Sequence, residues 1–128
     1  LSFTFSGSGF SIGNGTVTAV YKRCGTEVSG HVEFVFGSTS SVSGDVTFTP
    51  PVAQGTYGVV NIPIGVNRLL TGGSGYAGVV LALTTTRFRV AVYVASGTYL
   101  SAATLSSTVP GTWTTNDIIQ FPFSYIGA

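Results

Sequence analysis

Few side chains in this sequence could carry out acid–base or nucleophilic chemistry. They are four carboxylates, one histidine and one cysteine: Glu27, Glu33, Asp45, Asp117, His31 and Cys24. Hydrolysis of a glycoside needs two carboxylates that face each other across about 5–10 Å, and no local spacing here indicates such a pair. A small hydrolase that uses Glu33 or Asp117 is therefore the least favoured hypothesis, and we expect the protein not to be an enzyme.

His31 and Glu33 are separated by one residue, so in a strand their side chains point to the same face. Two ligands on one face could begin a metal site, but zinc needs a third and usually a fourth ligand. One histidine and one cysteine supply too few, so we predict no metal and no cofactor. The pair is interpreted as a polar pair facing solvent or, alternatively, an oligomer axis that brings copies of His31 together.

Nucleophilic chemistry has little support in the sequence. Gly7-Ser8-Gly9 and Gly73-Ser74-Gly75 lack the strand and helix that flank a G-x-S-x-G nucleophile turn. The glycine-rich segments also lack a following helix, which excludes a phosphate-binding loop. Cys24 is interpreted as a small, partly buried thiol.

Aromatic side chains are the better candidates for a ligand site. Tyrosine and tryptophan rings could stack on sugars, with arginines as hydrogen-bond donors, and the candidates are Trp113, Tyr93, Tyr99, Tyr57, Arg87 and Arg89. The alternative is structural, because an amphipathic ring also packs at the boundary of a core with its polar atom outward. In that case Trp113 caps one end of the core.

The composition of the chain is unusual, and it indicates which kind of secondary structure positions these residues. Only 7% of the 128 residues are charged, against roughly 25% in an average globular domain, and 44% are hydrophobic. Disorder is excluded by the apolar content, and a basic nucleic-acid-binding face is not expected with five cations. The longest apolar run is Val79 to Leu83, far below the roughly 20 residues of a spanning helix, so we predict no membrane insertion.

Alternation of apolar and polar residues predicts strands throughout the chain. Phe88, Val90, Val92 and Val94 share one face of a strand, with Arg87, Arg89 and Tyr93 on the other. In the segment 27–37, Val28, Val32, Phe34 and Phe36 oppose His31 and Glu33. The other expected strands are 16–22, 44–49, 57–64, 76–83, 99–105 and 119–125.

These runs and the turn clusters between them predict an all-β fold, an antiparallel β-sandwich of about eight strands, jelly-roll-like or another Greek key. Residues 1–12 are expected to be an N-terminal arm or leading strand, and residues 13–128 one domain. Pro122 cannot donate to a ladder, so its strand is placed at an edge or a bulge. The chain begins with Leu1 and shows no signal-peptide pattern, which predicts a processed chain or a piece of a longer one.

One segment carries a family resemblance. Residues 13–53, GNGTVTAVYKRCGTEVSGHVEFVFGSTSSVSGDVTFTPPVA, contain G-N-G, a tyrosine at position 21, a strand ending in F-G, a Ser/Thr-rich loop and a final F-x-P-P segment. The later residues Pro110, Thr112, Trp113, Asp117 and Tyr125 continue the pattern. The chain from Gly13 onward resembles a C-terminal β-sandwich domain of tail-associated structural proteins of phages that infect actinobacteria. Two positions depart from that pattern: Pro50 replaces a leucine, and residues 24–27 differ from the usual Val-Gly-Lys/Arg-Thr.

The resemblance implies a structural domain of a virion appendage: a tail fibre, tail tip or capsid-decorating module on the particle surface. It implies a homotrimer that contacts other virion proteins and a host-surface glycan or protein. It supplies no catalytic residues. The alternative is a non-catalytic carbohydrate-binding module of a larger protein.

Val35 supports an assembly role independently of the resemblance. It shares the face of His31 and Glu33, away from the residues expected in the core. We therefore predict that the face of His31, Glu33 and Val35 is covered by a neighbouring subunit or element.

Overall fold

The computed structural model describes residues 1–55 and 63–128, which form antiparallel strands joined by turns and loops. The strands are β1 (Gly7–Ser11), β2 (Thr16–Cys24), β3 (Glu27–Val35), β4 (Ser41–Phe48), β5 (Pro63–Thr71), β6 (Ser74–Thr84), β7 (Arg87–Ser96), β8 (Tyr99–Thr104) and β9 (Ile118–Ile126). The expected all-β antiparallel class is confirmed.

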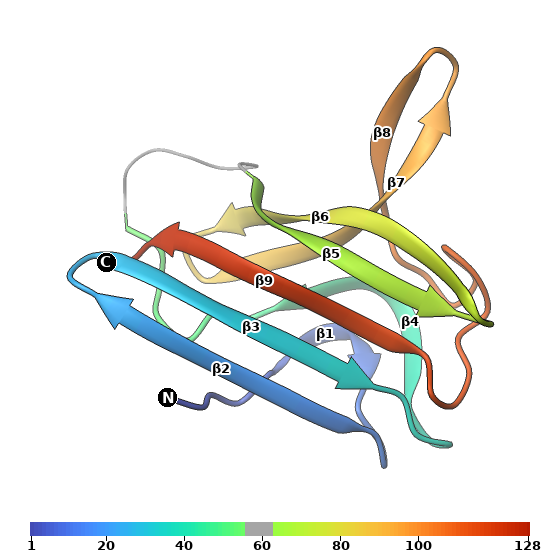
Figure 1. Cartoon of the computed structure of the whole chain (residues 1–128), viewed down its shortest axis with the longest axis horizontal. Helices are drawn as coiled ribbons and strands as arrows, with labels where there is room; N and C mark the ends of the chain where they lie inside the picture. Colours follow the sequence, from blue (N-terminus) through green and yellow to red (C-terminus); the bar gives the residue numbers. More distant parts are fainter. Residues whose placement is uncertain (56–62) are drawn as a thin grey trace.

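The strands belong to one hydrogen-bonded sheet in the order β1-β4-β7-β6-β5-β9-β3-β2, and β8 pairs with β7 outside this path. The sheet curls around a single core, so that β1 and β4 lie across from β2 and β3 (Figure 1). The hydrogen-bonded path is continuous, and a division into two packed sheets, as in a sandwich, stays a prediction.

The N-terminal segment brings the two ends of this curled sheet together. The Phe3 amide donates to the Ala19 carbonyl at 3.0 Å, and Ser2 forms a bridge with Val20, so the segment adds to the outer edge of β2. A few residues later β1 pairs with β4 at the opposite end of the path. Phe5, between these two contacts, is buried in the core. The segment predicted as an arm or leading strand thus pairs with the sheet at both ends.

The core is built from the faces that the alternation predicted. Val28, Val32, Phe34 and Phe36 are buried, as are three of the four predicted residues of β7. Val94, the fourth, is half-buried because β7 leaves the body of the sheet near its end (Figure 1). Aromatic rings fill the centre, where Phe48 contacts Phe88 edge-on at 5.7 Å.

The strand predicted at 57–64 lies mostly outside the described residues, whereas β5 was missed. Its alternation is hidden because a core-facing position holds Asn67, which is buried among apolar residues. The Asn67 Nδ2 donates to the carbonyls of Val79 (3.2 Å) and Ala91 (2.7 Å) and so ties β5 to β6 and β7. These two bonds satisfy the buried Nδ2 group, whereas the buried Oδ1 has no hydrogen-bond partner among the described residues.

The placement of Pro122 at a sheet edge was wrong, because β9 lies between β3 and β5. The proline is tolerated because β5 and β9 are paired only over Arg68–Leu70, and their ladder has ended before Pro122. There the β5 backbone approaches closely at Gly65, where a Cβ would lie 2.2 Å from the Pro122 carbonyl oxygen. A bulge beside Gly65, between Pro63 and Gly65 in the pairing with β6, accompanies this irregularity.

Candidate functional site

The outer face of the sheet is the first candidate surface. Five uncharged residues are cross-strand neighbours in one row over five adjacent strands: Thr16, Val35, Ile118, Leu70 and Gly75. Val35, Ile118 and Leu70 are half-buried although they point away from the core. We call these three residues the apolar row.

His31 and Glu33 lie on the same face as the apolar row, as predicted. In the register His31 sits between Val20 and Pro122. The Glu33 carboxylate accepts a hydrogen bond from Gln120 Nε2 at 3.1 Å. Among the described residues no further cysteine or carboxylate lies close enough to join His31 and Glu33 in a cluster that could hold a metal ion.

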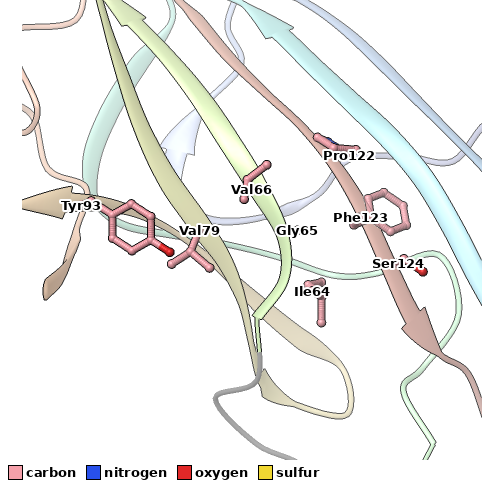
Figure 2. A pocket seen from close by; sticks show the side chains of 8 residues that line it. All are labelled: Ile64, Gly65, Val66, Val79, Tyr93, Pro122, Phe123 and Ser124. Atoms are coloured by element: carbon pink, nitrogen blue, oxygen red, sulfur yellow. The ribbon is translucent and has the colours of Figure 1, made fainter. Parts of the chain in front are cut away.

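Two shallow grooves on this face share Pro122 and Phe123. The first has a volume of about 420 Å³ and opens where β5 and β9 separate (Figure 2). Its lining carries no charged side chain and consists of Ile64, Gly65, Val66, Val79, Tyr93, Pro122, Phe123 and Ser124. Figure 2 shows the Tyr93 side chain pointing toward Val79, at the side of the groove opposite Phe123. The second groove includes His31, Lys22 and Val20.

The β7–β8 hairpin is the second candidate surface, because it extends away from the rest of the sheet (Figure 1). Its side chains include Tyr99 and Leu100, which are 80% and 69% exposed. Residues 90–116 contain no charged side chain, so the whole hairpin beyond Arg89 is neutral. An exposed apolar surface without charge is typical of an interaction site.

The predicted ligand residues are not gathered into one site. Tyr93 lies on the outer face with Arg87 and Arg89, whereas the register pairs Tyr99 with Ser96 and so places its ring on the other face of the hairpin. The Arg89 guanidinium donates to the Asp45 carboxylate from Nε (3.0 Å to Oδ1 and 3.1 Å to Oδ2) and from Nη2 (2.7 Å to Oδ2). Tyr57 lies outside the described residues.

Trp113 has the contacts expected of a residue that caps the core. Its indole stacks on Phe36 at 5.0 Å, and Phe36 in turn stacks on Phe34 at 4.5 Å. The indole Nε1 donates to the Ser106 carbonyl at 2.9 Å. This ring therefore offers a sugar neither its inner face nor its polar atom, and the structural interpretation is favoured.

Asp117 and Cys24, the other chemically distinctive residues, have different surroundings. Asp117 is buried, and its carboxylate accepts hydrogen bonds from the amides of Thr114 (2.7 Å) and Gly72 (3.2 Å). It thereby holds the β5–β6 turn against the loop before β9. The Cys24 thiol is exposed, which corrects its expected partial burial.

Several residues of these surfaces were missed from the sequence. Leu70 and Val66 belong to β5, which was not predicted. Ile118 lies on the face of β9 opposite to the buried residues of that strand. An apolar residue at a position where the alternation expects a polar one was the sequence signal that could have identified it. Leu100 fell within a predicted strand, but the alternation there could not show that both faces are exposed.

Comparison with protein-family models, curated proteins and solved structures gives no match to this chain. Within residues 1–55 and 63–128 there is no helix of the length and apolar character needed to cross a membrane.

Proposed function

We propose that this chain is a non-catalytic assembly and attachment domain of a phage particle, which forms a homotrimer and contacts other virion proteins and the host surface. The location follows from the sequence resemblance. The observation that carries the assembly role is the apolar row, since Val35, Ile118 and Leu70 lie next to one another on the outside of the sheet.

The chemistry of the outer face favours a protein partner over bulk water. Half-buried aliphatic side chains on adjacent strands gain free energy when a neighbouring subunit removes their remaining surface from water, at roughly 25 cal/mol per Å². The neighbouring row on one side, which contains Glu33, Gln120 and Arg68, supplies polar groups beside the apolar row. An apolar centre with a polar rim is the usual composition of a subunit interface.

The proposal is tested by the mass of the Val35→Lys variant in solution. A lysine in the apolar row, directly beside Ile118, would bury an unpaired charge, so the trimer contact should be lost and the mass should fall at the same protein concentration. The matched control is Ile126→Lys, at the far end of β9 on an exposed residue, which should leave the mass unchanged. A Val35→Lys chain with the wild-type mass would contradict the proposal.

A second function, carbohydrate binding, is favoured by one observation. The Tyr93 ring is 42% exposed beside a groove that also contains Ser124, and an exposed ring next to a hydroxyl is suited to a sugar. Measurable binding to a glycan array that is lost in Tyr93→Ala, by a chain that is monomeric, would favour this function over the assembly domain.

A further inference from the structure

Strand β8 presents an open edge of the sheet. It pairs with β7 on one side only, and no further backbone hydrogen bond of the described residues involves Tyr99–Thr104. An open edge can pair with another strand, and native proteins normally protect it with charge, proline or a bulge. β8 has the sequence YLSAAT, which contains none of these, and its pairing with β7 is regular.

The two end strands of the main path, β2 and β1, are protected. Residues 1–3 cover the outer edge of β2, which also carries Lys22 and Arg23. β1 is five residues long and is interrupted by a register shift at Gly9. β8 therefore differs from both end strands, because it has none of these devices.

The turn determines which backbone groups of β8 face outward. Strands β7 and β8 are joined by the two residues Gly97 and Thr98, with Gly97 at a φ of 62°. In a hairpin of this kind the pair next to the turn, Ser96 and Tyr99, exchanges hydrogen bonds, and the pairs then alternate. The N–H and C=O groups of Leu100, Ala102 and Thr104 consequently point to the open edge.

The sequence of β8 is complementary to itself in one antiparallel register. When two copies are related by a two-fold axis at Ser101, Leu100 of each copy lies opposite Ala102 of the other, and these two residues have the outward backbone groups. In the same register Tyr99 lies opposite Ala103. Each large side chain thus meets an alanine on its own face, and no charges are opposed.

We infer that the β8 edge pairs with the β8 edge of a second copy of this chain, with the two Ser101 residues facing each other across the two-fold axis. The contact shares no residue with the apolar row, so it stands independently of the proposed trimer. In this register Ser101 faces Ser101 in a pair without hydrogen bonds, for which the Cα–Cα distance is about 4.5 Å.

The register is tested by disulfide trapping in a Cys24→Ser background, which removes the exposed native thiol. Ser101→Cys places two thiols within disulfide range, so mild oxidation of the full chain should convert most of it to a covalent dimer on a non-reducing gel. The matched control is Thr104→Cys, on the same strand but opposite Thr98 in this register, and it should form little dimer. Equal trapping at the two positions, or trapping at neither, would overturn the proposal.

The hydrogen bonds are tested separately with Ala102→Pro. This change removes one outward N–H and leaves the bonds to β7, so the hairpin should stay folded. The dimeric contact should be lost, while Ala102→Ser, which keeps the N–H, should retain it. Val35→Lys should still be trapped through Ser101→Cys, because the two surfaces are separate. Ala102→Pro that is trapped as efficiently as the parent would overturn the edge pairing and leave the proposed trimer untouched.

Discussion

The curled body of the sheet and the β7–β8 hairpin are made from the same few residue types but differ in how their surfaces are used. In the body, each strand has one face in an aromatic core, and the two ends of the sheet are joined by residues 1–11. In the hairpin, both faces are largely exposed and one edge is open. The body therefore supplies the stability, and the hairpin supplies a surface that contributes little to folding. The following predictions test this contrast, beginning with the largest effect.

Trp113→Ala should lower the free energy of unfolding by about 3–5 kcal/mol, because it removes the outermost ring of the stack on Phe36. Urea denaturation measures the change. Trp113→Phe, which keeps an aromatic ring in place, should lose clearly less. An intact Trp113→Ala fold with loss of ligand binding would instead assign this residue to a ligand site.

Asp117→Ala should lower the free energy of unfolding by about 2–4 kcal/mol, since it leaves the amides of Gly72 and Thr114 without their acceptor. Asp45→Ala is the comparison, because its ion pair with Arg89 is partly exposed and contributes at most about 1 kcal/mol. Thermal melts of both variants suffice. Similar losses would show that the buried carboxylate has no special structural role.

Tyr125 is expected to make the body sensitive to alkaline pH. Burial raises the pKa of Tyr125 to about 12, against an opposing hydrogen bond with the Val52 backbone. Between pH 10 and 12 the folded chain keeps a proton that the unfolded chain releases, so the free energy of unfolding falls as the pH rises, by about 2–3 kcal/mol in total. The Tyr125→Phe variant should show a shallower decline in urea titrations over this range. An unchanged slope would assign the alkaline loss to other groups.

Leu100→Ser should change the free energy of unfolding by no more than about 0.5 kcal/mol, because this side chain already lies in water. The measurement is made on dilute protein, so that self-association does not contribute. A loss comparable to that of Trp113→Ala would remove the distinction between body and hairpin.

The sequence predicted most of the strands of the body, because each of them has one face exposed to solvent and one face buried in the core. Alternation placed Phe34, Phe88 and their neighbours correctly, and Val35 indicated an outer apolar surface. It failed where tertiary structure overrides the pattern: Asn67 is buried through hydrogen bonds to two other strands, and Pro122 occupies an interior strand because the β5–β9 ladder ends before it.

The candidate surfaces were harder to predict than the core. Which rows of residues become neighbours depends on strand order, and the path β5-β9-β3 joins segments distant in sequence. The apolar row could therefore not be assembled from periodicity, and the separation of Tyr93 from Tyr99 depends on the hairpin register. The open edge of β8 is likewise a property of the sheet and not of the strand.

The most direct test of the central claim is the mass in solution of the wild type, Val35→Lys and Ala102→Pro at equal, high protein concentration. Two separate assembly surfaces predict a wild-type mass above three times the 13.1 kDa chain, three copies for Ala102→Pro and two for Val35→Lys. A wild-type chain that stays at 13.1 kDa at every concentration would contradict the account.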